Sequence, residues 1–433
     1  MTFRISTLLA PALLLAAAPA RGDLPAERAP AAAFLRDDAA LIEWVRTRSP
    51  EVAAAQSRVD QAQAGVGSAR LFPNPSLDAT MGNVNVGSSA QTDVRGADRL
   101  SWGVGISQEL ELGKRGPRID AADLSAQASR EELRASLAER VADARVAIGE
   151  AVRLQVRQTI LEESLTESRD HLALEKVRLQ HGDLSGIDYD RLVLDALGQE
   201  ADVRRNRAEL ESALASCAAI LLAPCETGEA GPDDLDAAAT VPAEIADPEE
   251  ALRERPDYRA ILLGRSAAQK EATLARRRAI PDPTLSVSYS HDLFNELTDT
   301  VQFGVGIPLP LFDRGQHDAA LATAKARELD RTAAGTIQQG LGEVRGLAAQ
   351  RRTLEETLSR LDEEALPLSN GILETARKAF AQGEYSLTDL LLARRENTEL
   401  RLQVLDLRGE LFTVRNDLRK ALGLDAAAAR SAP

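Results

Sequence analysis

One awkward phrase occurs twice in the sequence, and it restricts the fold more than any other feature. The first copy, LFPNPSL, starts at Leu71, and the second, AIPDPTL, starts about 208 residues later at Ala279. The prolines concerned are Pro73, Pro75, Pro281 and Pro283. Proline cannot continue a helix interior, and it forces the residue before it out of the helical region. We therefore predict that a helix ends and an extended strand begins at both places.

Other matches show that the whole chain is an internal duplication. The motif GVGI at Gly103 returns at Gly304, about 201 residues later. A second motif, made of Gly182, Ser185 and Asp188, returns at the same spacing as Gly383, Ser386 and Asp389. Similarity at a fixed period indicates repeated structural units. We predict repeat 1 over residues 37–223 and repeat 2 over 248–423, with a linker or equatorial segment at 224–247 and a disordered tail at 424–433.

Each repeat begins with a helix and then contains a β-hairpin, at residues 73–110 and 281–310. Apolar and polar residues alternate in four segments of these hairpins. The apolar series are Leu77, Ala79 and Met81; Trp102, Val104 and Ile106; Leu285, Val287 and Tyr289; and Val301, Phe303, Val305 and Ile307. Segments of about ten residues with one apolar and one polar face are typical of transmembrane β-strands. The alternative is a surface sheet of a soluble protein.

The rest of each repeat is predicted to be a long helical hairpin, at residues 117–223 and 315–423. The chain is rich in Ala, Leu, Arg and Glu and has only 3% aromatic residues, which is typical of long helices or coiled coils. The first helix of the first hairpin would be roughly 95 Å long. Pro367 should kink its counterpart in repeat 2. The last helix carries a heptad seam of Leu400, Val404, Leu407, Leu411, Val414, Leu418 and Ala421.

The N-terminus is predicted to be a cleaved signal peptide, residues 1–20, followed by an extended segment, 21–36. Arg4 supplies the positive start, an apolar run follows, and Ala18-Pro19-Ala20 is the cleavage site. No cysteine follows this site, so we expect no lipid anchor. The net charge of −15 argues against nucleic acid as a partner. An exported chain without an apolar helix of about 18 residues must enter a membrane by other means.

These expectations together require an assembly. Four strands cannot close a barrel, and lipid does not tolerate an open sheet edge. Bacterial outer-membrane barrels have an even number of strands, about eight at least. Three copies under cyclic symmetry would supply twelve strands and remove the edges. The fold class is therefore predicted to be mainly α with a four-stranded β contribution. In the homotrimer, a 12-stranded barrel would continue into a long periplasmic α-helical barrel.

The residues also resemble a known family. The duplicated strand pair and helical hairpin, with the stretch RPDYRAILLGRSAAQKEATLARRRAIPDPTLSVSY from Arg255, resemble the TolC-like outer-membrane efflux proteins, or outer membrane factors. The stretches ELELGKRG and IPLPLFDRG resemble the CzcC and CusC-like subgroup that serves heavy-metal efflux pumps. The resemblance implies a homotrimer in the Gram-negative outer membrane, embedded in lipid and projecting into the periplasm. Its implied partners are a periplasmic adaptor and an inner-membrane pump of the resistance-nodulation-division (RND) type.

The resemblance also implies roles for the helical turns. They would form the periplasmic tips that meet the adaptor, through Gly182, Ser185, Gly383, Tyr385 and Ser386. Asp389 falls where the family places an aspartate that narrows the pore, and Asp188 is its equivalent in repeat 1. The family's second aspartate is Leu392 here, so a double acidic ring is not expected. Capping of a helix N-terminus is the alternative explanation for both aspartates.

No metal site, cofactor or enzyme is expected. The four histidines, two methionines and two cysteines show no metal-ligand spacing, and no catalytic motif occurs. Cys217 and Cys225 could form a disulfide in an oxidising compartment, or Cys217 could be a small core residue.

We therefore predict an outer-membrane exit duct for heavy-metal cations such as cobalt, zinc, cadmium, copper or silver. The alternatives are a duct for organic compounds or type I protein secretion, and a periplasmic coiled-coil scaffold without a pore.

Overall fold

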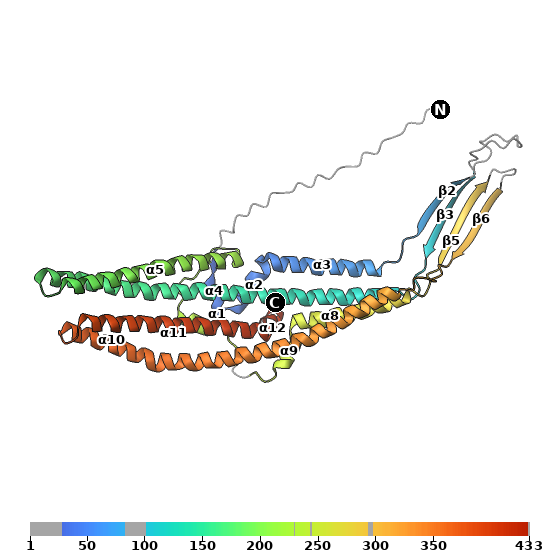
Figure 1. Cartoon of the computed structure of the whole chain (residues 1–433). Coiled ribbons are helices and arrows are strands. Elements are labelled where there is room, and N and C mark those ends of the chain that lie inside the picture. Colours follow the sequence, from blue (N-terminus) through green and yellow to red (C-terminus); the bar gives the residue numbers. More distant parts are fainter. Residues whose placement is uncertain (1–27, 83–100, 229, 243–244, 293–297, 432–433) are drawn as a thin grey trace, which may run out of the picture.

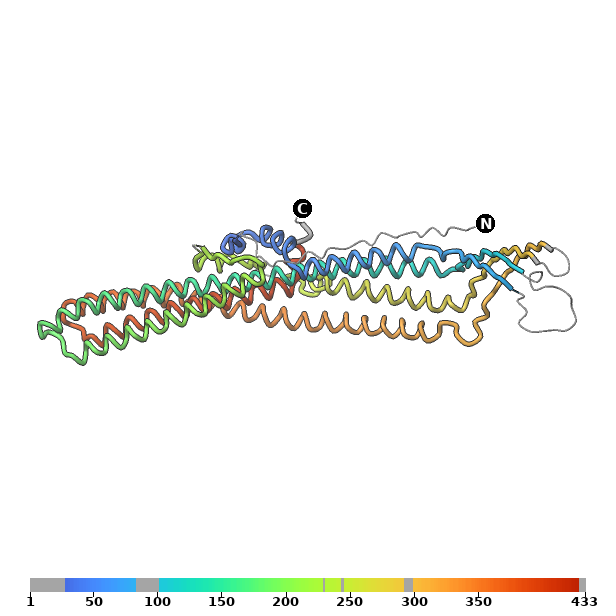
Figure 2. The backbone as a smooth tube through the Cα atoms, turned by 90° about the horizontal axis from the view of Figure 1, so that it is seen from above, coloured from blue at the N-terminus to red at the C-terminus, as the bar shows by residue number. Residues whose placement is uncertain are grey.

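The computed structural model of the chain describes residues 28–82, 101–228, 230–242, 245–292 and 298–431. The predicted signal peptide at 1–20 and the following residues 21–27 lie outside this part. The described chain is elongated, with four strands at one end and two helical turns at the other (Figure 1). The turned view shows the same long hairpins side by side (Figure 2).

Repeat 1 follows the order helix, strand pair, helical hairpin. Its elements are α2 (Asp38–Arg48), α3 (Pro50–Arg70), β2 (Ser76–Gly82), β3 (Ser101–Glu109), α4 (Arg115–His181) and α5 (Gly186–Leu221). Helix α3 begins at a proline preceded by Ser49, whose hydroxyl accepts the N–H of Val52 at 3.4 Å. It ends before the double-proline phrase, so Pro73 and Pro75 lie between α3 and β2. The phrase thus separates helix from strand because neither proline fits a helix interior.

Repeat 2 has the same order of elements. They are α7 (Pro248–Glu254), α8 (Pro256–Arg277), β5 (Thr284–Asp292), β6 (Thr298–Gly306), α9 (Gln316–Arg360), α10 (Leu366–Ala381) and α11 (Leu387–Ala421). Pro281 and Pro283 lie between α8 and β5. A π-helical turn, Leu361–Ala365, separates α9 from α10 just before Pro367. The missing N–H of this proline removes one helical hydrogen bond, and the wider turn accommodates the loss.

The four long strands form one antiparallel sheet in the order β2-β3-β5-β6. Its register brings the apolar series onto a single face, because Leu77 lies opposite Ile106, which lies opposite Val287. Val287 in turn lies opposite Phe303. Most of these apolar side chains are exposed in the single chain. The sheet therefore has an uncovered apolar face, and β2 and β6 are its two unpaired edges.

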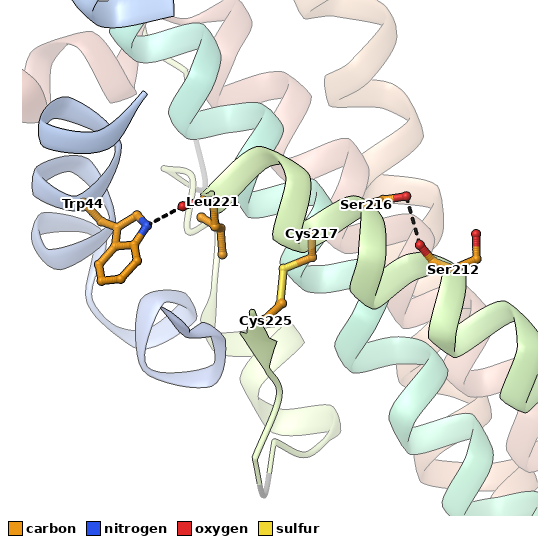
Figure 3. The surroundings of a disulfide bond; sticks show 6 residues. All are labelled: Trp44, Ser212, Ser216, Cys217, Leu221 and Cys225. Carbon is orange, nitrogen blue, oxygen red and sulfur yellow. Dashed lines mark hydrogen bonds between the residues drawn. A yellow bond between two sulfur atoms is a disulfide. The ribbon is translucent and has the colours of Figure 1, made fainter. Parts of the chain in front are cut away.

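A large hydrophobic cluster lies near the middle of the molecule, where α4, α5 and α11 meet the N-terminal helices. Ile148 and Val152 of α4 are fully buried there, close to Phe412 of α11. Within the cluster, a disulfide joins the buried Cys217 of α5 to Cys225 of β4 (Cys225–Glu226) (Figure 3). The seam of the last helix packs as expected from its heptads, with Val404, Leu411 and Val414 against Leu354 and Leu358 of α9.

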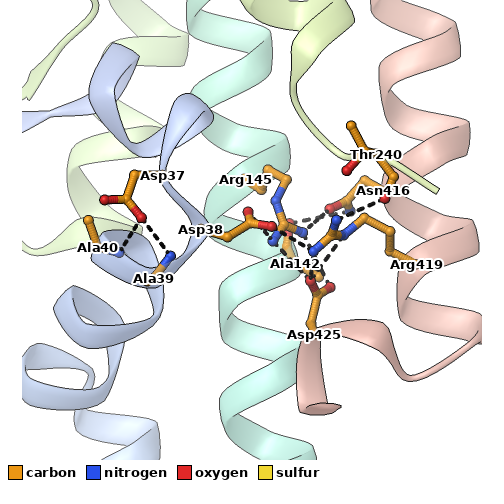
Figure 4. Close-up of polar contacts among 10 residues, drawn as sticks. All are labelled: Asp37, Asp38, Ala39, Ala40, Ala142, Arg145, Thr240, Asn416, Arg419 and Asp425. Carbon is orange, nitrogen blue, oxygen red and sulfur yellow. Dashed lines mark hydrogen bonds and ion pairs between the residues drawn. The ribbon is translucent and has the colours of Figure 1, made fainter. Parts of the chain in front are cut away.

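Two expectations about the chain ends were wrong. The segment predicted to be extended forms α1 (Ala31–Arg36), because Phe34 and Leu35 are buried in the central cluster. The tail predicted to be disordered forms α12 (Leu424–Ser431), because Asp425 is buried in an ion cluster with arginines of α4 and α11 (Figure 4). The predicted linker holds β4, which pairs with β1 (Ala29–Pro30), and α6 (Pro232–Ala237).

None of the described helices is both long enough and apolar enough to cross a lipid bilayer.

Candidate functional site

The two helical turns lie together at the end of the molecule opposite the sheet (Figures 1 and 2). Gly182 follows α4 with φ of 80°, and Gly383 follows α10 with φ of 76°. A left-handed backbone at these positions favours glycine, which has no Cβ to clash with the carbonyl. Ser185 and Ser386 then cap α5 and α11. The sequence motif found twice is therefore a turn-and-cap unit that reverses each hairpin.

Each cap positions the aspartate that we considered as a pore residue. The Ser185 hydroxyl accepts the N–H of Asp188 at 3.1 Å and donates to its carboxylate at 2.7 Å. In repeat 2, the Ser386 hydroxyl and N–H both donate to the Asp389 carboxylate, at 2.6 and 3.0 Å. These bonds from Ser386 lower the pKa of Asp389. Helix capping thus accounts for the placement of both carboxylates.

The capping bonds leave both aspartates on exposed tips. Arg191 pairs with the Asp188 carboxylate at 3.3 Å, whereas no cation pairs with Asp389 in the described part of the chain. Tyr385 and Leu392, which lie on either side of Asp389, have exposed side chains. One chain provides one carboxylate at each position, so an acidic ring would need further copies. The pore role of Asp188 and Asp389 therefore stays a prediction.

The sequence analysis missed a half-buried polar site behind the tips. The His171 ring on α4 contacts the Phe380 ring of α10 edge-on, with ring centres 5.4 Å apart. Burial lowers the pKa of His171, and the nearby Arg394 guanidinium lowers it further. Burial also lowers the pKa of Arg394, whose Nε and Nη1 have no hydrogen-bond partner among the described residues. No local motif marks this site, because its residues come from three helices.

The first hairpin also has several exposed apolar residues near its tip. They are Leu174 and Val177 on α4 and Ile187, Leu194 and Leu197 on α5. Single exposed apolar residues are common on protein surfaces, so this exposure does not by itself define a contact surface.

The opposite end of the molecule carries the sheet and its connections to the helices. Here the Asp282 carboxylate accepts the N–H of Leu112 at 2.8 Å and pairs with the Lys114 ammonium. The Lys114 ammonium and the Leu112 N–H lower the pKa of Asp282 against the opposing effect of its burial. Asp282 belongs to the second double-proline phrase, so the phrase joins the two repeats as well as ending a helix.

The described residues offer neither a metal site nor a reactive thiol. They contain no group of three or more His, Cys, Asp or Glu side chains that could hold a metal ion. Cys217 and Cys225 are joined to each other and offer no thiol. The site is therefore a pair of helical tips and an apolar sheet face, at opposite ends of one chain.

Solved structures with the same fold are channels. The chain superimposes on a CusC crystal structure with a TM-score of 0.74 and 21% identity, covering 89% of this chain and 91% of the other. The outer-membrane channel OprN gives a TM-score of 0.73 and 20% identity, with coverage of 92% and 93%. The open MtrE channel of Neisseria gonorrhoeae gives 0.72 and 20%, with coverage of 89% and 88%.

Sequence relatives have the same character. The cobalt-zinc-cadmium resistance protein CzcC of Cupriavidus metallidurans is 25% identical over 86% of each chain. The pyoverdine export outer membrane protein OpmQ of Pseudomonas putida is also 25% identical, over 88% of this chain and 85% of its own.

A family model described as "Outer membrane efflux protein" matches residues 41–219 and 248–424, which is well over half of the chain. This match confirms the resemblance and the prediction that the chain is no enzyme. The chain belongs to the outer membrane efflux protein family.

Proposed function

We propose that three copies of this chain form the exit duct of a tripartite RND-type efflux system. The observation that carries the proposal is the sheet: its four strands expose one apolar face and end in two unpaired edges. Lipid would cover such a face, and neighbouring copies would pair the edges. Twelve strands would then cross the outer membrane, and the six long hairpins would form a tube in the periplasm.

The helical tips would meet the other proteins of the system. Gly182, Ser185, Gly383, Tyr385 and Ser386 would contact a periplasmic adaptor that connects to the inner-membrane pump. Repeats 1 and 2 would each contribute one hairpin to this end. Asp389, and with it Asp188, would surround the pore and attract cations, because a narrow low-dielectric opening concentrates the field of its charges. The predicted signal peptide, residues 1–20, would be removed on export.

The proposed cargo is a heavy-metal cation such as cobalt, zinc, cadmium, copper or silver. It is supported by the subgroup motifs ELELGKRG and IPLPLFDRG and by the similarity to CzcC over most of both chains. A duct for organic compounds is the second candidate, because OpmQ is equally identical and its name describes pyoverdine export.

Deletion of the gene tests the cargo. We expect the deletion strain to lose tolerance to one or more of these metal salts, with tolerance to hydrophobic antibiotics unchanged. The reverse pattern would contradict the metal assignment and support the second candidate. Purified protein in a planar bilayer tests the duct itself, and trimers that conduct ions are expected. A particle that is not trimeric or does not conduct would favour a scaffold without a pore.

A further inference from the structure

A polar contact joins the two repeats where their hairpins meet in the sheet. The equivalent positions at the two sheet edges have no such contact among the described residues of the chain. β3 is the second strand of the repeat 1 hairpin and runs toward the helices, and it pairs with β5, the first strand of the repeat 2 hairpin, which runs away from them. At the helical end of this strand pair, Asp282 of the PDP phrase accepts the N–H of Leu112 and pairs with Lys114. Asp282 is only 8% exposed. This contact, between an incoming and an outgoing strand, is the internal joint.

The two edge strands of the sheet, β2 and β6, are also the first strand of one hairpin and the second strand of the other. Each is unpaired on its outer side within the described part of the chain. β6 is the second strand of the repeat 2 hairpin, and β2 is the first strand of the repeat 1 hairpin. Asn74 of the PNP phrase stands where Asp282 stands in repeat 2, at the spacing of about 208 residues. Within the described residues, the Asn74 side chain makes no hydrogen bond or other polar contact. One half of a joint is therefore present at each edge of the sheet.

The duplication identifies the residue that would face Asn74. The strands and tips of the repeats correspond at about 201 residues, which places Asp313 at the position of Leu112. Aligning Arg115-Gly116 with Arg314-Gly315 gives a spacing of about 199, which places Asp313 at the position of Lys114 instead. Both alignments bring Asp313 to the place of a residue that binds Asp282. Its carboxylate is exposed, and one of its oxygens accepts the N–H of Gly315 at 2.8 Å.

Apolar residues at the edges are more exposed than those of the internal joint. Leu110 and Leu112 of the internal joint are 41% and 46% exposed. Leu311 and Phe312, which follow β6, are 65% and 93% exposed. Phe72, which precedes β2, is 67% exposed, whereas its counterpart Ile280 is 44% exposed. Both edges thus lack a covering surface that the internal joint possesses.

We propose that Asn74 of one copy binds Asp313 of the next copy, which closes the joint between copies as Asp282 closes it within the chain. The Asn74 amide donates to the Asp313 carboxylate, and Phe72 covers the apolar residues after β6. An aspartate at position 74 would repel Asp313, because two carboxylates within hydrogen-bond range carry like charges. The sequence therefore has PNP where the partner is an acid and PDP where the partner is Lys114. This inference rests on the proposed trimer.

Cysteine crosslinking tests the contact. The native cysteines are bonded to each other, and no free cysteine exists among the described residues. We expect the double variant Asn74→Cys with Asp313→Cys, oxidised in the membrane, to lose its monomer band on denaturing gels in favour of covalent dimers and trimers. The two single variants should stay monomeric there. Asp282→Cys with Lys114→Cys is the matched control for the internal joint, because these two side chains pair within one chain, and it should crosslink without an increase in mass.

A charge exchange tests the chemistry independently of crosslinking. Asn74→Asp should lower the temperature at which the trimer dissociates in detergent. Adding Asp313→Lys should restore it, since the pair then has the charges of Asp282 and Lys114. Asp313→Asn in the Asn74→Asp background is the neutral control and should restore part of it.

The outcomes separate the inference from the proposed function. An unmodified chain that is not trimeric in native mass spectrometry overturns both. Trimers in which the Asn74→Cys and Asp313→Cys pair fails to crosslink, while the internal control crosslinks, overturn the inference alone. An unchanged dissociation temperature of the Asn74→Asp variant does the same.

Discussion

Arg145 of α4 donates hydrogen bonds to both carboxylate oxygens of Asp425 on α12, at 2.9 and 3.2 Å. Both side chains are 1% exposed. Asp38 of α2 accepts from Arg145 at 3.0 Å and from Arg419 of α11 at 2.7 Å, which completes a cluster of two cations and two anions (Figure 4). The opposite charges balance within the cluster, and its bonds attach α2 and α12 to the middle of α4 and to the last turn of α11.

Removal of one member should leave a buried charge without compensation. We expect Asp425→Ala to lower the free energy of unfolding by about 3–5 kcal/mol, because Arg145 and Arg419 would lose their shared acceptor. Asp330→Ala is the matched control, since Asp330 pairs with Arg265 at the surface and such a pair contributes about 0–1 kcal/mol. Thermal unfolding in detergent measures both. Equal effects of the two substitutions would contradict the stabilising role of this ion cluster.

A close helix crossing provides a second test. A Cβ added at Gly149 of α4 would lie 2.2 Å from Cε1 of Phe412 on α11. Gly149→Ala should therefore destabilise the chain by about 1–3 kcal/mol through overpacking. Phe412→Leu in the same chain should recover part of the loss by removing the contacting ring atoms. Gly335→Ala on α9 is the control, since nothing lies within 4 Å of the added Cβ, and it should stabilise slightly. A harmless Gly149→Ala would rule out this crossing.

The disulfide should stabilise the region next to the central cluster. It closes a short loop with a sequence separation of 8, so its loss should cost about 2 kcal/mol. Trp44 reports on this region, because its Nε1 donates to the Leu221 carbonyl at 3.0 Å (Figure 3). We expect the Cys217→Ala with Cys225→Ala variant to shift Trp44 fluorescence at a lower temperature than the wild type. Measurements in a Trp102→Phe background isolate the signal, and an unchanged midpoint would show that the bond is dispensable.

Local patterns explain which parts of the fold were predictable. The double prolines and the alternation of apolar and polar residues involve only neighbouring residues. They were therefore enough to locate the strands and the ends of the helices before them. The turn-and-cap motif likewise depends on φ and on a hydroxyl three residues before its acid. The ion cluster had no such signal, because Arg145 and Asp425 are 280 residues apart. The tail appeared disordered from its composition alone, although one buried carboxylate anchors its helix. His171 was missed for the same reason as Arg145.

The tip acids can be tested by ion selectivity. The pKa of Asp389 is lowered by its bonds from Ser386, so its carboxylate stays charged at neutral pH. Asp389→Asn should keep an acceptor for the Ser386 N–H while removing the charge, and it should reduce the preference of the channel for cations in planar bilayers. Glu374→Gln, at an exposed position of α10, is the control. An unchanged selectivity would leave capping as the only role of Asp389.

The stability of the hairpin tips should depend on pH through His171. The pKa of His171 is lowered by burial, by Arg394 of α11 and by Arg178 of α4, while Glu175 opposes the shift. A histidine in water titrates at about pH 6.5, so below that pH a locally unfolded tip binds more protons than the folded tip. The stabilisation from neutral His171 is therefore complete above about 6.5 and is lost as the pH falls through its lowered pKa.

Hydrogen exchange of the two hairpin tips at about pH 7.5 and 5.5, corrected for intrinsic rates, measures this effect. We expect the protection of α4 and α10 around His171 and Phe380 to fall at the lower pH. His171→Phe should remove most of the difference, because the ring contact with Phe380 survives without a titrating group. His317→Asn should retain it, since His317 is exposed and is the second residue of α9, whereas the tip of this hairpin follows α10. Equal pH dependence in the wild type and the His171→Phe variant would assign the effect to other groups.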